Sequence, residues 1–145
     1  MDRETAAVKS ALKLSIGRRS VRTLELDLPK PLSVNNLFFN VPDKGRVASA
    51  AYKEWRKQAG LQIMAQRIGH IGGPVEIYIG VKEGKGDLDG TIKCLLDSLV
   101  HNGIIDGDGP KVVRRLVVEW ADVPGARIGI KPSADWLARK IGLRK

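Results

Sequence analysis

The stretch VEIYIGVKEGKGDLDGTIKCLLDSLVH, residues 75–101, contains the two patterns that decide the fold. Residues 75–81 alternate apolar and polar side chains, which predicts a half-buried strand. After a loop at 82–86, residues 88–101 place apolar side chains at helical spacing, which predicts an amphipathic helix that stops at Asn102-Gly103. The expected buried face of this helix consists of Leu88, Ile92, Leu95, Leu96 and Leu99.

Three further strands are predicted, one before this stretch and two after it. Residues 21–28 alternate in the same way, and residues 112–120 and 127–131 flank a turn at Pro124-Gly125. The short turn predicts that the last two strands form a hairpin.

A long helix is predicted at 49–69, with Ser49 as its N-cap. Its apolar stripe consists of Tyr52, Trp55, Ala59, Ile63 and, less regularly, Ile68. The preceding residues 33–46 are rich in turn formers and predict a loop that carries function. The order β-α-β-α-β-β predicts a small α+β domain, in which a four-stranded mixed sheet is covered by two main helices.

The charge of the chain is concentrated at its ends. The 145 residues carry 25 Lys and Arg against 16 Asp and Glu, a formal charge of +9. Residues 1–22 and 131–145 hold eight of these nine charges, and the 108 residues between them are close to neutral. Basic ends suit contacts to the phosphates of DNA or RNA, although many charged tails are only solvated segments. We expect a basic arm at 1–20, the folded domain at 21–131, and a basic tail or short helix at 132–145.

Composition excludes several classes of protein. A single cysteine, Cys94, rules out an intramolecular disulfide and a Cys-rich zinc site. No apolar run reaches the roughly 18 to 20 residues that a membrane span needs. These features predict a cytoplasmic protein with an anionic partner, nucleic acid ahead of a membrane surface.

Two acidic pairs bracket the helix at 88–101: Asp87 with Asp89, and Asp106 with Asp108. In an extended chain residues i and i+2 point the same way, so Asp87 and Asp89 can converge on one point. Carboxylates suit Mg²⁺, and a metal would relieve their repulsion of a nucleic acid phosphate. The pairs can meet only if the second loop folds back over the helix start or a neighbouring chain supplies it. Alternatively, Asp89 is an N-cap and the DGDG loop is an ordinary turn.

Other polar residues extend this hypothesis. Lys93 lies one helical turn after Asp89, where it either holds a phosphate or forms an exposed ion pair. Asp97, one turn further on, can orient Lys93. The loop at 33–46 adds side chains that either contact phosphate or form turns: Ser33, Asn35 and Asn36. The helix at 49–69 shows basic side chains to one side: Lys53, Arg56 and Lys57. His70 and His101 are predicted to be structural.

These residues resemble the RusA family of Holliday-junction resolvases, which are small dimeric, magnesium-dependent endonucleases of bacteria and their prophages. The family's DLDN-x-x-K-x-x-x-D-x-L segment is similar to DLDGTIKCLLDSL at 87–99, and its third Asp, nineteen residues beyond the second, corresponds to Asp108. Its Ser-Asn-Asn loop is similar to PKPLSVNN at 29–36, with Val34 inserted. Its Gly-Arg and helix tyrosine correspond to Gly45-Arg46 and Tyr52. The resemblance covers residues from about 24 to 130.

The resemblance implies a set of catalytic residues: Asp87, Asp89 and Asp108 as Mg²⁺ ligands, and Lys93 as the catalytic lysine. The chain departs from the pattern at Gly90, where the family has Asn, and at Gly107, where it has the first Asp of an Asp-Asp pair. Asp106, one residue earlier, is a candidate to share the role of Asp108.

Together these features predict a Mg²⁺-dependent endodeoxyribonuclease that cuts four-way DNA junctions in recombination and repair, in a bacterial cytoplasm and encoded by the cell or a prophage. A four-way junction has two symmetric strands to cut, so we expect a homodimer with two sites. The residues expected to contact DNA are Ser33, Asn35, Asn36, Arg46, Lys53, Arg56 and Lys57. The competing functions are a non-catalytic basic nucleic-acid-binding module and a ribosome-associated basic protein.

Overall fold

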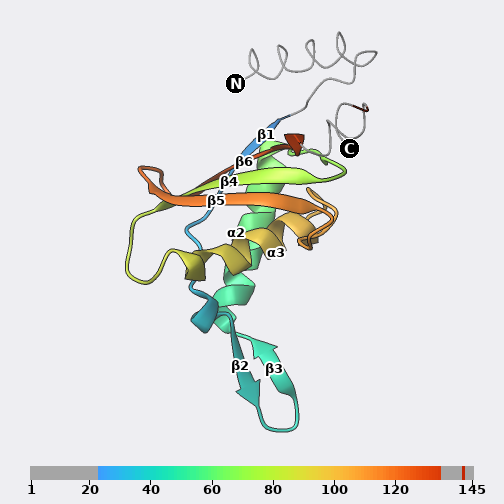
Figure 1. Ribbon diagram of the computed structural model, residues 1–145. Helices are drawn as coiled ribbons and strands as arrows, with labels where there is room; N and C mark the ends of the chain where they lie inside the picture. The colour runs from blue at the N-terminus through green and yellow to red at the C-terminus, as the bar shows by residue number, and fades with distance from the viewer. Residues whose placement is uncertain (1–22, 135–141, 143–145) are drawn as a thin grey trace.

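The computed structural model describes residues 23–134 and Gly142. The arm predicted at 1–20 lies outside the described residues, as does the predicted tail or short helix at 132–145 apart from 132–134 and Gly142. Figure 1 shows a four-stranded mixed sheet with two main helices packed against one face, so the predicted α+β architecture is confirmed.

The sheet consists of β1 (Leu24–Leu28), β4 (Val75–Lys82), β5 (Val113–Ala121) and β6 (Ala126–Pro132), in the order β1-β6-β4-β5. β4 is parallel to β5 and antiparallel to β6, which is antiparallel to β1. The register pairs Ile79 of β4 with Val118 on one side and Ile128 on the other. Alternate apolar residues of β1, β4 and β6 are buried on the face that the helices cover, as half-buried strands require.

The prediction that the last two strands form a hairpin is wrong, because β4 lies between β5 and β6. The connection at 122–125 instead crosses the end of β4, where the Lys82 N–H donates to the Gly125 carbonyl at 2.8 Å. The physical reason is burial. β4 is buried along most of its length and takes a central position, whereas β5 exposes Arg115 and Glu119 and suits an edge.

The first long helix, α2 (Ala50–Gln66), begins as predicted after Ser49, whose hydroxyl accepts a hydrogen bond from the Tyr52 N–H at 3.0 Å. Its buried side chains are the predicted stripe of Tyr52, Trp55, Ala59 and Ile63. The helix ends earlier than predicted because Arg67 adopts the left-handed conformation, with φ at 55°. No helix within residues 23–134 is long and apolar enough to span a membrane.

The second helix, α3 (Ile92–His101), follows a 3-10 turn, η3 (Asp89–Thr91). Leu95 and Leu99 are buried as predicted, but the rest of the buried face consists of Cys94 and Ser98. The other three leucine and isoleucine residues of the predicted face are only half-buried. Both small side chains find partners: Cys94 Sγ lies 3.6 Å from the Leu32 carbonyl oxygen, and the Asn102 amide donates to Ser98 Oγ at 3.3 Å.

The segment at 33–46, which was predicted to be a loop, contains regular structure. It forms a 3-10 turn, η2 (Val34–Asn36), and a hairpin of β2 (Phe38–Val41) and β3 (Gly45–Ala48). The turn between the strands is possible because Asp43 and Gly45 both adopt positive φ, at 70° and 74°. Figure 1 shows this hairpin projecting beyond the N-terminal start of α2, away from the sheet.

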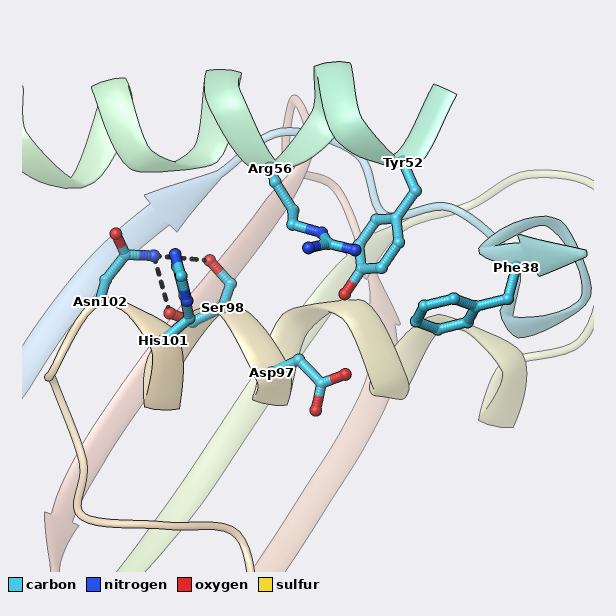
Figure 2. Close-up of a pocket in the computed structure, with 7 residues that line it drawn as sticks. All are labelled: Phe38, Tyr52, Arg56, Asp97, Ser98, His101 and Asn102. Carbon is cyan, nitrogen blue, oxygen red and sulfur yellow. Dashed lines mark hydrogen bonds between the residues drawn. The ribbon is translucent and has the colours of Figure 1, made fainter. Parts of the chain in front are cut away.

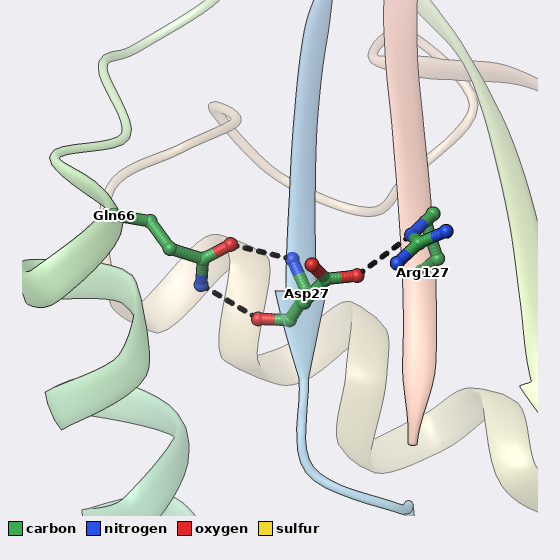
Figure 3. Close-up of polar contacts among 3 residues, drawn as sticks. All are labelled: Asp27, Gln66 and Arg127. Atoms are coloured by element: carbon green, nitrogen blue, oxygen red, sulfur yellow. Dashed lines mark hydrogen bonds and ion pairs between the residues drawn. The ribbon is translucent and has the colours of Figure 1, made fainter. Parts of the chain in front are cut away.

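A side chain covers the free edge of the sheet at β1. The Gln66 amide accepts from the Asp27 N–H and donates to the Asp27 carbonyl, both at 2.7 Å (Figure 3). Arg127 of β6 donates to the Asp27 carboxylate at 2.9 Å. Because an edge strand leaves N–H and C=O groups unpaired, Gln66 satisfies two of them and fastens the end of α2 to the sheet.

Candidate functional site

The Ser33 loop is held against the start of α3. The Ser33 hydroxyl accepts from the Asn35 N–H at 3.4 Å, and the buried Leu37 anchors the end of η2 in the core. η2 packs against both η3 and α3, so the neutral loop residues lie beside the segment that contains Asp89 and Lys93. Two motifs that are far apart in the sequence therefore meet in the fold, and Asn35 and its neighbour Asn36 remain exposed there.

Gly90 and the inserted Val34, at which these two motifs differ from the family pattern, lie next to each other. A Cβ atom at Gly90 would be 3.5 Å from Ser33 Oγ and 3.9 Å from Cγ1 of Val34. Both distances are ordinary van der Waals contacts, and φ at Gly90 is not in the left-handed region. Gly90 therefore leaves room beside the inserted Val34, and the backbone there accepts a side chain.

Asp87, Asp89 and Lys93 are exposed at the start of α3. The N-cap positions of η3 and α3 are Leu88 and Thr91, and neither helix start has a side-chain capping bond, so Asp89 is not an N-cap. Among residues 23–134 the Asp87 and Asp89 carboxylates have no hydrogen-bond partner. Lys93 Nζ lies 3.2 Å from Oδ1 of Asp97, one turn further along the helix.

Asp106 and Asp108 lie in the loop at the other end of α3. Ile104 and Ile105 are buried, and the Ile71 N–H donates to the Ile104 carbonyl at 2.9 Å. The Asp106 carboxylate lies 2.7 Å from His70 Nε2 and accepts from the Gly73 N–H at 3.3 Å, and these bonds lower the pKa of Asp106. The loop is thus fastened to the connection between α2 and β4 and does not fold back over the start of α3.

The carboxylates of one chain are therefore separated. A helix of ten residues is about 15 Å long, and α3 lies between the exposed Asp108 and the pair Asp87 and Asp89. Within the described part of the chain, no group of three or more His, Cys, Asp or Glu side chains is arranged to hold a metal ion. The chain between Asp87 and Asp89 is not extended as expected, because Leu88 has helical backbone angles (φ −59°, ψ −43°), so the expectation that their carboxylates point the same way does not hold. One chain supplies two exposed carboxylates at the start of α3, and the third from a distance.

The basic residues that were expected to contact DNA lie on the hairpin and on the adjoining part of α2. Arg46 and Arg56 each cover an aromatic ring, with the guanidinium carbon 4.2 Å from the centroid of Phe38 and 4.1 Å from that of Tyr52. Lys53 and Lys57 are exposed on α2. These four side chains make a basic surface beside the Ser33 loop.

The motifs stand without support from known relatives. No protein-family model and no curated protein matches this chain. The similarity to the RusA family therefore depends on the residues quoted above and stays a prediction.

A pocket that the sequence did not indicate lies between α2 and α3 (Figure 2). Its volume is about 280 Å³, and it is lined by Phe38, Tyr52, Arg56, Asp97, Ser98, His101 and Asn102. Burial raises the pKa of Tyr52, and the nearby Asp97 raises it further. Tyr52 was predicted as a core residue and as the counterpart of the family's helix tyrosine, and His101 only as a structural residue. Only the spacing of these residues could have indicated the pocket. One helix has Tyr52 and Arg56 one turn apart, and the other has Asp97 and His101 one turn apart.

Proposed function

We propose that this protein is a Mg²⁺-dependent endonuclease that cuts four-way DNA junctions in recombination and repair. The observation that carries the proposal is the packing of η2 against η3, which joins the Ser33 loop to the Asp87–Lys93 segment. Exposed carboxylates, a lysine and neutral donors meet there beside a basic surface. A nuclease needs these groups together, whereas a module that only binds phosphate gains nothing from two unpaired carboxylates.

The donor set suits magnesium. Mg²⁺ is bound through one or two carboxylates together with waters and phosphate oxygens, and the free oxygens of Asp87 and Asp89 match this requirement. When bound, the ion would neutralise phosphate charge and lower the pKa of an attacking water. Lys93 donates to the phosphate or to the leaving oxygen, and Asp97, at 3.2 Å, holds its ammonium group in place.

The third carboxylate is proposed to come from a second copy of the chain. Asp108 lies at the far end of α3, so a two-fold axis near the middle of that helix would bring Asp108 of the partner subunit to Asp87 and Asp89. The same operation makes two equivalent sites. Two sites related by a two-fold axis fit a four-way junction, which has two symmetric strands to cut.

The competing proposal is a non-catalytic nucleic-acid-binding module. It is favoured by one observation: the described part of a single chain has no group of three metal-binding side chains. Both proposals predict junction binding through the basic surface, but only the nuclease predicts magnesium-dependent cutting.

The proposal predicts that Asp89→Asn abolishes cleavage of a synthetic four-way junction and leaves binding intact or tighter. The substitution keeps the shape of the side chain and removes the charge that a metal needs. Cleavage is measured by gel electrophoresis with Mg²⁺ and with EDTA, and binding by mobility shift in EDTA.

Asp122→Asn is the matched control, because Asp122 is an exposed aspartate in the connection between β5 and β6. It should cut as fast as the wild type. Wild-type protein that binds the junction but never cuts it would support the binding module instead.

A further inference from the structure

The sheet has an outer face that no helix among residues 23–134 covers. Both main helices lie on the other side (Figure 1), and the outer side chains are those that alternate with the buried ones. The register aligns one row of them across all four strands: Val117, Tyr78, Gly129 and Glu25. Parallel strands are generally covered on both faces of their sheet, so the parallel pair of β4 and β5 leads us to expect a second cover.

An outer hollow of about 280 Å³ lies in the middle of this face. It is deep because Gly80 and Gly129 have no side chains, and its walls include four apolar or aromatic residues: Tyr78, Val117, Ala121 and Val123. Within the described part of the chain, a Cβ atom at Gly129 would meet nothing within 4 Å apart from its chain neighbours. Glycine weakens a strand, and it is typical of a place where another backbone approaches closely.

Acidic side chains stand at the rim of the outer hollow. Glu25 and Glu119 line it, and neither forms an ion pair within residues 23–134. Arg127 also lines it, but its guanidinium group donates to the Asp27 carboxylate at 2.9 Å. An apolar hollow with unpaired carboxylates at its rim suits a segment that has both apolar and basic side chains, and it repels nucleic acid.

The chain itself has such a segment directly beside the outer hollow. Thr23 is one of the lining residues, so residues 1–22 join the fold at the rim. They hold six basic and two acidic side chains, and six of the ten residues at 7–16 are apolar: Ala7, Val8, Ala11, Leu12, Leu14 and Ile16. Leu12 precedes Thr23 by 11 residues. Even at the helical rise of about 1.5 Å per residue this length reaches about 16 Å, which exceeds the roughly 14 Å across four strands.

We propose that residues 7–16 pack into the outer hollow of their own chain, with apolar side chains over Gly80 and Gly129 and lysines beside Glu25 and Glu119. This inference does not depend on the proposed nuclease activity. It gives the sheet a cover on its second face, and it assigns part of the basic charge of the N-terminal segment to contacts within the protein instead of to DNA. The competing occupant is a second copy of the chain.

The first test is Gly129→Val in the whole chain of 145 residues. On a bare face this change should raise the melting temperature, because valine favours strands more than glycine does. In a covered hollow the added carbon atoms collide with the cover, so we expect the melting temperature to fall by about 3 °C or more. A rise in the melting temperature would overturn the inference.

The second test asks whether the cover is the N-terminal segment. Leu12→Asp places a charge in an apolar contact and should lower the melting temperature by about 5 °C. Because this variant vacates the hollow, adding Gly129→Val to it should cause no further fall. Leu61→Asp is the matched control, since Leu61 is 52% exposed on α2, and Gly129→Val should act there as it does in the wild type. Additive effects of Leu12→Asp and Gly129→Val would contradict the proposal.

Cross-linking identifies the chain that supplies the segment, and it remains decisive if Leu12→Asp does not fold. A Leu12→Cys and Val117→Cys double variant is treated with a short bis-maleimide. Cys94 should not react, because burial raises the pKa of its thiol to about 11. We expect a link within one chain, detected by peptide mass spectrometry of the monomer band. A link between two chains would assign the hollow to a second copy, and no link would equally overturn the inference.

Discussion

Gly90 stands where the DLDN pattern has Asn, and its surroundings show what the difference means physically. The residue lies in η3, its φ is compatible with any side chain, and the nearest atoms belong to Ser33 and Val34. Glycine loses more conformational freedom on folding than other residues. Gly90 is therefore destabilising unless another group occupies the space that a side chain would fill. The space at this position is not filled by another group.

Gly90→Asn should therefore fold, and its melting temperature should equal that of the wild type or exceed it by up to about 4 °C. The reason is that replacing an unstrained glycine raises the free energy of unfolding by about 0.4–1 kcal/mol. Thermal unfolding followed by circular dichroism measures this. A clear fall in melting temperature would show that the space between Gly90 and Val34 does not accept a side chain.

Gly125→Ala is the contrasting control. A Cβ atom there would collide with the carbonyl oxygen of Leu28 and lie 2.9 Å from the backbone nitrogen of Lys30. Because both obstacles are backbone atoms, we expect a loss of about 1–3 kcal/mol in the free energy of unfolding.

The sequence was informative at the residue scale where the chemistry is local. Ser49 as an N-cap and the alternation in β4 follow from neighbours in the chain, and both are observed. The sequence left open whether Asp89 is an N-cap, because capping depends on the backbone angles of the first turn. It also did not show that Asp106 is engaged by His70, a contact between residues far apart in the chain.

At the scale of elements, α2 and the sheet are joined at two places. Its apolar stripe packs into the core, and Gln66 bonds the free edge of β1 through Asp27. The second contact fixes the end of α2, and thereby the helix that carries the basic residues.

Gln66→Ala should lower the free energy of unfolding by about 1 kcal/mol, because two exposed hydrogen bonds to Asp27 are exchanged for bonds to water. Gln62→Ala, one turn earlier on the exposed side of α2, should change stability by less than about 0.5 kcal/mol. Urea denaturation of the two variants measures the difference. Equal stabilities would contradict a role for Gln66 at the edge of the sheet.

The elements were predictable where periodicity is strong, and their pairing was not. Alternation identified β1, β4, β5 and β6 as strands, but it contains no information on which strands lie side by side. The short link at 122–125 suggested that β5 and β6 form a hairpin. Instead, β4 lies between them and pairs with β5 on one side and with β6 on the other. The hairpin of β2 and β3 was missed because its strands are only four residues each and its turn residues dominate the segment.

At the scale of the whole molecule, the charge has two parts. Most of the +9 belongs to the ends of the chain, and residues 23–130 are nearly neutral. Within that neutral domain, five of the fourteen basic residues lie on the hairpin and α2, and carboxylates without a hydrogen-bond partner among residues 23–134 lie at the start of α3. This division of charge is the arrangement that a nuclease needs, with cations to hold phosphate and carboxylates to hold a metal.

The sequence named the residues of the candidate site but not their distribution between copies of the chain. The spacing of the acidic pairs allowed two solutions, a loop that folds back or a second chain. The bonds that fasten Asp106 to His70 and Gly73 remove the first solution. The proposed site is therefore shared between two copies, with Asp87 and Asp89 from one and Asp108 from the other.

The most direct test of this proposal is to mix two inactive subunits. Asp89→Asn and Asp108→Asn chains are co-expressed with different tags, the mixed dimer is purified, and junction cleavage in Mg²⁺ is compared with that of each homodimer. In a shared site both substitutions fall together in one of the two sites, and the other site is intact. The account predicts that both homodimers are inactive and that the mixed dimer cuts one strand of the junction. An inactive mixed dimer alongside an active wild type would contradict it, since each site would then belong to a single chain.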